Sequence, residues 1–514
     1  MKNKNKKDIL QLLETLKKAN RELANALPLP IKLSLLKDCH LYTLDIITTL
    51  TAEGQTPSEV LEQLSIYATT LKKLTFAPKT LNPKQLNVAL NKIESLIIKS
   101  PLGANQKYKA LFLPYKYAMS DSLESVWQAA LQDDTFETTI LPIPYFTKNT
   151  AGVAQDMIYE GHLYQVPTAN WEEYNLKDEK PDIVFIHNPY DDNNTLTSVH
   201  PDYYSEHLKV HTDLLCYVPY AMNNWRVDVN ASLGSLNADF IYLDQKTAAQ
   251  HRELFTEGLE KLNVTPTSKQ LDKFQGLGHP KYDAVINYTS IDIPETWVKK
   301  QAQNKPVIFY NTTLSSIYKN PKQFLDKLKF TLNEFSKRSD FVVLWRPHPL
   351  SESAFTNISP DLLEDYHGIV STFIQEDLHI YDDSPYFHRA IHFSDVYFGE
   401  FVGSSFFMFA AIGKPLFIQN PQVLDSAAPT SSTEEYILSQ FEAAKTTPYW
   451  EPLKFEESSP SNSLLNYFDL IQRSHQETLS LAIQSQIDGH RQHLNDGSAG
   501  IRIWEHAKNS LLND

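Results

Sequence analysis

The sequence contains only two cysteines, Cys39 and Cys216, among its 514 residues. They lie far apart in apolar surroundings, which excludes a disulfide framework and a zinc site of paired cysteines, and which fits a reducing compartment. Long apolar runs are also missing. No stretch reaches the roughly 20 uninterrupted apolar residues that a membrane-spanning helix needs, because the nearest candidate, residues 406–418, is broken by Gly-Lys-Pro at 413–415.

Positive charge is scarce, with 47 Lys and Arg against 62 Asp and Glu, a formal net charge of −15. This excess of acid argues against nucleic acid as the main ligand and against electrostatic adhesion of the whole body to an anionic membrane, although a local basic patch could still serve. In residues 1–20, charged residues return every few positions, which indicates an amphipathic helix and no signal peptide. We expect a cytoplasmic protein, with the inner face of the cell membrane as a second option.

Several catalytic motifs are absent. The sequence has no Walker loop, GxGxxG, GxSxG, HExxH or CxxC, which excludes the simplest versions of those chemistries. Two acidic pairs, Asp191-Asp192 and Asp382-Asp383, have no nearby histidine or third acid at metal-binding spacing, so we interpret them as loop and helix-capping carboxylates. We therefore expect neither a metal nor a cofactor.

Apolar residues are plentiful, at 42% of the chain, so cores can form, and the length suggests two to four domains. Residues 1–105 have helical periodicity, for example at positions 9, 12, 13 and 16. Two capping boxes are expected, Thr56 with Glu59 and Asn82 with Gln85. The pattern predicts an all-helical module, interpreted as a cap or a homodimerisation unit without chemistry.

From Tyr108 onward, short apolar runs alternate with helical segments, the first helix being expected to start with Asp121 as its cap. Alternation of this kind predicts parallel sheets with ligands at the carboxyl ends of the strands. Two series, in residues 106–292 and 293–514, indicate two Rossmann-type α/β domains facing a cleft, with closing helices at the C-terminus. The strand ends in the first series carry polar or aromatic residues: Tyr115, Lys116, His187, Asn188, Asp191, Tyr217 and Tyr220.

In the second series, the apolar run 341–345 ends in Arg346-Pro-His348-Pro. The prolines stiffen the loop, and a guanidinium has the donor geometry that phosphate oxygens need. A purely structural alternative is an arginine paired with a surface carboxylate and a histidine in a tight turn.

Gly403, Ser404 and Ser405 precede an apolar helix, where backbone N–H groups and hydroxyls can cradle phosphate. Ordinary serine capping explains the same pattern. Lys281, in the segment 278–283, and Thr312 stand in motifs that are individually more typical of turns.

Together, residues 278–283, 345–349 and 394–415 resemble, in order and spacing, the C-terminal half of the CDP-glycerol glycerophosphotransferases, the teichoic-acid polymerase-like enzymes. Residues 108–130 and 182–192 extend the likeness over nearly the whole chain, beyond a helical N-terminal extension. The resemblance implies a GT-B fold, no metal, and a nucleotide bound by the C-terminal domain. It also implies transfer of a polyol phosphate, most specifically glycerol phosphate, from a CDP-linked donor to a hydroxyl of a cell-surface glycan or its lipid-linked precursor.

Under this resemblance, Arg346 and His348 hold the pyrophosphate and the reacting phosphoryl group, and Ser404 and Ser405 cradle phosphate. Glu400, or the segment 401–403, stands where the family usually has Asp-Tyr. The substrate site is completed by Gly403, Lys281 and Thr312.

The family's Trp-His-Gly-Thr-Pro motif, whose histidine is the implied base, is absent, since residues 216–225 contain no histidine. His187, at the end of a neighbouring strand, is the expected replacement, and a turn histidine bonded to local backbone is its alternative. Two other functions stay open: a GT-B glycosyltransferase that uses a nucleotide sugar, and a catalytically degenerate binding or scaffold protein.

Overall fold

The computed structural model divides the chain into two compact units, and each is described by itself. The first comprises Met1–Tyr108 with Asp134–Glu137, and the second comprises Lys109–Asp133 with Thr138–Asp514. Cys39 and Cys216 are both free and buried. The structure describes residues 3–25, 27–52, 56–99, 107–149, 151–194, 196–222, 232–289, 292–301, 305–400, 404–414, 416–418 and 494–513.

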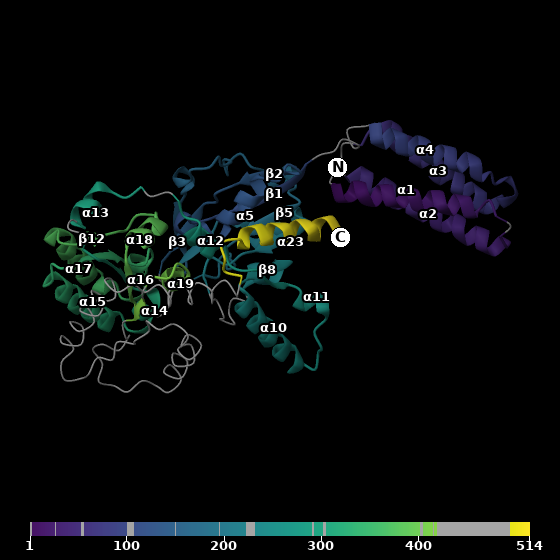
Figure 1. Ribbon diagram of the computed structural model, residues 1–514. Helices are drawn as coiled ribbons and strands as arrows, with labels where there is room; N and C mark the ends of the chain where they lie inside the picture. The colour runs from purple at the N-terminus through teal and green to yellow at the C-terminus, as the bar shows by residue number, and fades with distance from the viewer. Residues whose placement is uncertain are drawn as a thin grey trace. The chain divides into compact units, whose positions relative to one another are not determined.

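The first unit is a four-helix bundle, as the periodicity of residues 1–105 predicts (Figure 1). Each helix packs on the next, and the first packs on the last, around a leucine- and isoleucine-rich core. Short loops make sequential helices antiparallel neighbours. The elements are α1 (Asn3–Glu22), α2 (Leu29–Ala52), α3 (Ser58–Phe76), η1 (Pro78–Thr80) and α4 (Pro83–Lys99).

One of the two expected caps is present. Asn82 accepts a hydrogen bond from the Gln85 amide (3.3 Å), as predicted. The prediction for Thr56 is wrong, because Pro57 occupies the N-cap position of α3 and the Thr56 hydroxyl donates instead to the carbonyl of Leu50. None of the helices in the described part of the chain is long and apolar enough to cross a membrane.

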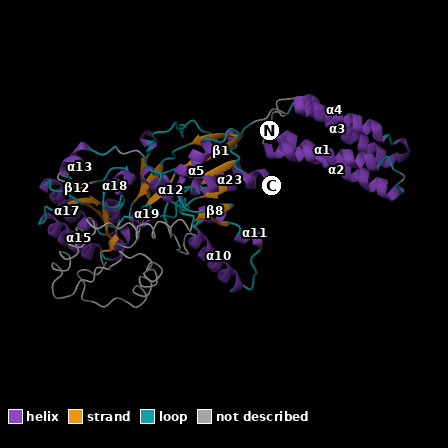
Figure 2. Cartoon of the chain, viewed as in Figure 1, coloured by secondary structure: helices purple, strands orange, loops and turns teal. Residues whose placement is uncertain are grey.

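The second unit contains a six-stranded sheet, whose strands are orange near the labels β1 and β8 in Figure 2. Its strand order is β2-β1-β5-β7-β8-β9. The pairs from β1 to β9 are parallel, and their strands are nearly continuous apolar runs, as expected of a sheet covered on both faces. The strands are β1 (Tyr108–Leu113), β2 (Phe136–Ile140), β5 (Ile183–Ile186), β7 (Leu214–Tyr217), β8 (Phe240–Leu243) and β9 (Phe274–Gly276).

Helices connect these strands, and a small antiparallel sheet, ordered β4-β3-β6, is inserted among them. That sheet consists of β3 (Tyr145–Lys148), β4 (Ala154–Ile158) and β6 (Thr197–Val199). The helices are η3 (Tyr117–Met119), α5 (Asp121–Leu131), η4 (Gly161–Leu163), α6 (Leu176–Glu179), η5 (Pro201–Tyr203), α7 (Ser205–His211), α9 (Leu233–Asn237), α10 (Gln245–Glu260), α11 (Ser268–Leu271) and α12 (Pro280–Ile286).

A second, fully parallel sheet has the order β12-β11-β10-β13-β14. Its strands are β10 (Val307–Asn311), β11 (Val342–Arg346), β12 (Ile380–Tyr381), β13 (Val396–Gly399) and β14 (Leu416–Ile418). Its helices are α13 (Glu295–Lys300), α14 (Leu314–Lys319), α15 (Pro321–Ser336), α16 (Ser351–Ile358), η6 (Pro360–Leu362), α17 (Leu363–Glu376), α18 (Phe387–Phe393) and α19 (Ser404–Ala411). The chain thus has two Rossmann-type sheets, and the predicted GT-B-like fold class is confirmed.

The last helix, α23 (Ala499–Asn513), returns to the first sheet, where it packs on α5, α12 and β7. Asp283 accepts hydrogen bonds from the amides of Ala499 (3.0 Å) and Gly500 (2.7 Å) at its start. Further along, Trp504 donates to Asp133 (3.2 Å). The sequence analysis placed this helix with the second Rossmann domain, whereas its contacts belong to the first.

Candidate functional site

The strand order of each sheet reverses at one point, and ligands of open α/β sheets bind outside the carboxyl ends of the strands there. In the first sheet the reversal lies between β1 and β5, which lead into Lys116 and His187. In the second it lies between β10 and β13, which lead into Thr312 and Glu400. These strand ends are the candidate site.

His348, two residues beyond β11, is half-buried. Its Nδ1 accepts a hydrogen bond from the Leu350 amide (3.1 Å), so the neutral ring carries its proton on Nε2. Burial, and then the charges of Lys116 and Arg346, lower the pKa of His348 to about 3. The imidazole is therefore neutral near pH 7, and Lys116 brings a cation from the first sheet to its surroundings.

Lys116 follows β1, and its ammonium lies 5.6 Å from the centre of the Tyr145 ring. Burial lowers the pKa of Lys116, and the negative charge of Glu160 opposes that shift. Glu160 accepts hydrogen bonds from the Tyr117 amide (2.6 Å) and the Tyr145 hydroxyl (2.7 Å). The Tyr145 ring thus lies beside this lysine, and Glu160 acts on it through its charge.

Arg346, at the end of β11, is 4% exposed. It forms an ion pair with Asp382 and donates to the carbonyl of Ser384 (2.6 Å), and its guanidinium lies 5.2 Å from the centre of the Phe387 ring. The partner of Arg346 is thus a carboxylate, as the structural alternative predicted, but this carboxylate is buried and does not lie on the surface. This arrangement makes Arg346 an organiser of the loop after β12.

Glu400, just beyond β13, is buried and forms an ion pair with Lys327 (2.9 Å). It also accepts from the Thr313 amide (3.2 Å) and from the hydroxyls of Thr313 and Ser316. Although burial raises the pKa of Glu400, Lys327 and these donors lower it further, so the net shift is downward. The carboxylate ties the loop after β10 to the end of β13, an arrangement that fits an anchor better than a substrate contact.

Thr312, in that anchored loop, is buried, and its hydroxyl has no hydrogen-bond partner in the described part of the chain. Ser404 begins α19 and is half-buried, and Ser405 is buried beside it. Gly403 lies outside the described residues. Of the expected phosphate cradle, the structure therefore describes the two serines, and Thr312 is a separate predicted substrate residue.

His187, directly after β5, is fully buried. Its Nε2 accepts from the Tyr115 amide (3.0 Å), and its Nδ1 lies 3.1 Å from both the Met119 carbonyl and the Ser122 hydroxyl. Burial is the main cause that lowers the pKa of His187 to about 3. Nε2, the nitrogen that could take up a proton, already accepts a hydrogen bond from the Tyr115 amide. This arrangement suits a residue that positions the loop after β1. A role as base stays a prediction.

Lys281, the remaining predicted site residue, is buried in an ion pair with Asp121 (2.5 Å). His388 of α18 approaches the other oxygen of Asp121 (3.1 Å). Although burial raises the pKa of Asp121, Lys281 and His388 hold it well below its usual range. The prediction of Asp121 as a cap is wrong, because Ser120 occupies the N-cap position and the carboxylate links α5 to α12 and α18.

The acidic pairs behave as loop carboxylates where the structure describes their contacts. Asp191 accepts from the Ser205 amide (3.0 Å) and hydroxyl (2.7 Å) at the start of α7, and Asp382 pairs with Arg346. Within the described ranges, no three His, Cys, Asp or Glu side chains are grouped so as to hold a metal ion.

In the second sheet, the loops that carry Arg346 with His348, Thr312 and Glu400 follow the adjoining strands β11, β10 and β13, and the loop of Thr312 is bonded to Glu400 through Thr313. The charge of Lys116, which follows β1 of the first sheet, acts on His348. His187 and Lys281 are enclosed in separate networks. The sequence analysis noted Lys116 only as a strand-end residue. The sequence feature that could have singled it out is its place shortly after a buried strand. Its effect on the pKa of His348 could not be predicted, because the two residues lie in different halves of the sequence.

Comparisons with known proteins give fold likeness only. No family model matches the chain, and no curated protein matches it. The Staphylococcus aureus protein MnaA with UDP is 15% identical, with 79% of this chain and 97% of that one covered and a TM-score of 0.46. A UDP-N-acetylglucosamine 2-epimerase is 11% identical, with coverages of 80% and 97% and a TM-score of 0.48. A variant of the wall teichoic acid polymerase TagF is 12% identical, with coverages of 89% and 99% and a TM-score of 0.39.

Proposed function

We propose that this chain is a transferase that moves a polyol phosphate, most specifically glycerol phosphate, from a CDP-linked donor to a hydroxyl of a cell-surface glycan or its precursor. The observation that carries the proposal is the neutral His348 ring, whose Nδ1 accepts from the Leu350 amide so that Nε2 carries the proton, and on which the charge of Lys116 acts. The motif resemblance of residues 278–283, 345–349 and 394–415 supplies the donor class.

The acceptor hydroxyl attacks the phosphorus that carries the polyol, the bond from this phosphorus to the bridging oxygen breaks, and CMP leaves with that oxygen. The hydroxyl proton passes to a base or to solvent. His348 Nε2–H donates to a phosphate oxygen, and Lys116 stabilises the charge that develops in the transition state. Ser404 and Thr312 donate hydroxyl hydrogen bonds to the diphosphate, and Arg346 positions the His348 loop.

A thermal-shift screen of the full chain against CDP, CMP, UDP, GDP and ADP tests the donor class. A ligand at a hundred times its dissociation constant stabilises the folded state by about 2.7 kcal/mol. We expect CDP and CMP to stabilise most, and CDP-glycerol to be converted to CMP with an acceptor present, in EDTA as without it. Stabilisation by UDP with no turnover of CDP-glycerol would favour a nucleotide-sugar glycosyltransferase. Stabilisation by no nucleotide would favour a scaffold.

A further inference from the structure

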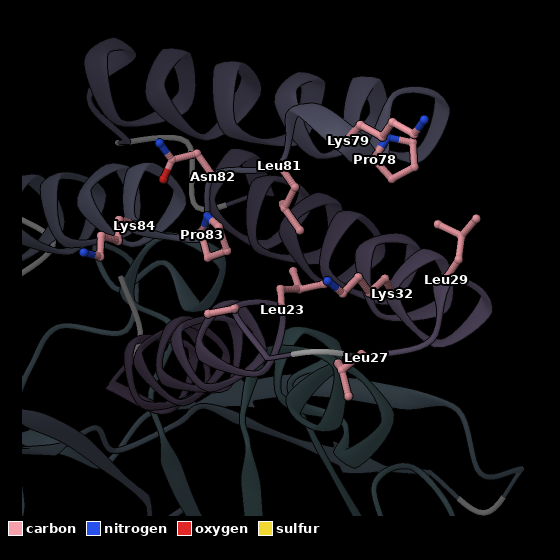
Figure 3. Close-up of a pocket in the computed structure, with 11 residues that line it drawn as sticks. Leu23, Leu27, Leu29, Lys32, Pro78, Lys79, Leu81, Asn82, Pro83 and Lys84 are labelled. Carbon is pink, nitrogen blue, oxygen red and sulfur yellow. The ribbon is translucent and has the colours of Figure 1, made fainter.

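The four-helix bundle has a pocket at one end, where the end of α1 and the start of α2 meet the residues between α3 and α4 (Figure 3). Its volume is 620 Å³, within the range of roughly 300–1,000 Å³ typical of small-molecule sites. All its lining residues belong to the first unit, so no residue of the strand-end site contributes to it.

The floor of this pocket is apolar. Leu23 is buried in the bundle core, and the half-buried Leu81 packs against that core and points toward Lys32 and Leu23 in Figure 3. Leu29, on the rim, is 55% exposed, and Phe76, shortly before the rim residue Pro78, is 83% exposed. An occupant with an alkyl chain would remove this apolar surface from water.

The rim is cationic. Lys32, Lys79 and Lys84 line the pocket, no acidic residue does, and none of the three has an ion-pair partner in the described part of the chain. Elsewhere in the bundle, by contrast, Lys17 is paired with Glu94 (2.7 Å). An anion would therefore find Lys32 beside the apolar hollow, and Lys79 and Lys84, whose ammonium ends point to different sides in Figure 3, would add positive potential at the rim.

The charge of the whole segment points the same way. Residues 1–100 contain 15 of the 47 Lys and Arg but only 9 of the 62 Asp and Glu, a net charge of +6, whereas the rest of the chain carries −21. A basic module on an acidic chain attracts anions that the remainder repels.

We infer that this pocket binds an alkyl phosphate, with the chain on Leu23, Leu29 and Leu81 and the phosphate at Lys32, where Lys79 and Lys84 add positive potential from the rim. A phosphate monoester carries nearly two negative charges at neutral pH and three acceptor oxygens, which suits several lysines better than a carboxylate does. The inference does not depend on the proposed function.

Calorimetric titration of the full chain with dodecyl phosphate, below its micelle concentration, is the test. We expect saturable binding that weakens about 10-fold for decyl phosphate, since each methylene contributes about 0.8 kcal/mol. Dodecanoate should bind more weakly, and inorganic phosphate should bind weakest. Equal affinity for dodecyl phosphate and inorganic phosphate, or no saturable binding, would overturn the inference.

Replacing Lys32, Lys79 and Lys84 together by Gln should lower the affinity for dodecyl phosphate roughly 10- to 100-fold. The matched control replaces Lys72, Lys73 and Lys92 by Gln, which removes the same charge from exposed helix positions outside the pocket. An equal loss in both variants would mean diffuse attraction and no site. Lys79 and Lys84 are exposed, so their double variant serves if the triple variant does not fold.

Leu29→Gln, at an exposed position, should lower the affinity for dodecyl phosphate but leave the affinity for inorganic phosphate unchanged. Flotation with phosphatidylcholine vesicles, with and without dodecyl phosphate, distinguishes a membrane-borne ligand from a free one. Calorimetric binding supports the pocket whether or not the doped vesicles recruit the protein, and recruitment in addition would indicate a membrane-borne ligand. Recruitment by phosphatidylglycerol vesicles that is equal for the pocket and control variants, without binding of dodecyl phosphate, would replace the pocket by a general membrane-binding face.

Discussion

His187 and His348 follow strands in the two sheets, and both have pKa values lowered to about 3, yet their surroundings differ. His187 is sealed in, with Nε2 taken by the Tyr115 amide. His348 is half-buried, its Nδ1 is taken by the Leu350 amide, and its proton therefore sits on Nε2. A displaced pKa alone does not mark a working residue, because burial lowers it in either case. The accessible nitrogen is what separates the two.

Among the substitutions that test this difference between the two histidines, His348→Ala should have the largest effect. We expect turnover of CDP-glycerol to fall roughly 10²–10³-fold, because a donor to the transition-state charge is lost. The melting temperature should stay close to that of the parent. His367→Ala, at an exposed position, is the matched control. Parent-like turnover by His348→Ala would make this strand end structural.

Glu400→Gln tests whether the buried Glu400 carboxylate, like His187, is structural. Loss of its charge leaves Lys327 buried without a counter-ion, and breaking such a pair costs about 3–5 kcal/mol of stability. Urea unfolding measures this loss, with Glu352→Gln, on the surface, expected within about 0.5 kcal/mol of the parent. A small loss for Glu400→Gln, together with weakened donor binding, would restore Glu400 as a substrate contact.

The sequence predicts the sheets better than the site. Continuous apolar runs such as 341–345 identify buried parallel strands, and the residues that follow mark the correct edge of each sheet. What it cannot supply is the partner of each side chain. Arg346 meets Asp382, 36 residues away, and Asp121 meets Lys281 from beyond the first sheet. Pairings of this kind depend on tertiary packing, as does the return of α23 to the first sheet.

The pH dependence of stability sharpens the contrast further. The folded-state pKa of His187 lies below its unfolded value of about 6.5, so the unfolded chain binds more protons and stability falls as pH drops from about 6.5 toward 3. His187 should account for a loss of about 2 kcal/mol between pH 7 and pH 5. His187→Gln should remove that loss. Urea unfolding at both pH values measures it, and an unchanged pH slope would contradict the buried neutral ring.

Lys116→Met should give the smallest change in histidine ionisation, and this change separates the two histidines within one molecule. Lys116 lowers the pKa of His348 but is not among the charges that act on His187, where Lys281 is the cation. Removing Lys116 should therefore raise the pKa of His348 and leave that of His187 in place, since burial still dominates both. Ring carbon signals of labelled histidine, assigned by His348→Ala and His187→Gln and followed from pH 7 downward, report both groups at once. If both pKa values rise together, the variant has loosened the fold. If neither rises, Lys116 lies too far from His348 to share a phosphate with it, and the assignment of Lys116 to the donor site fails.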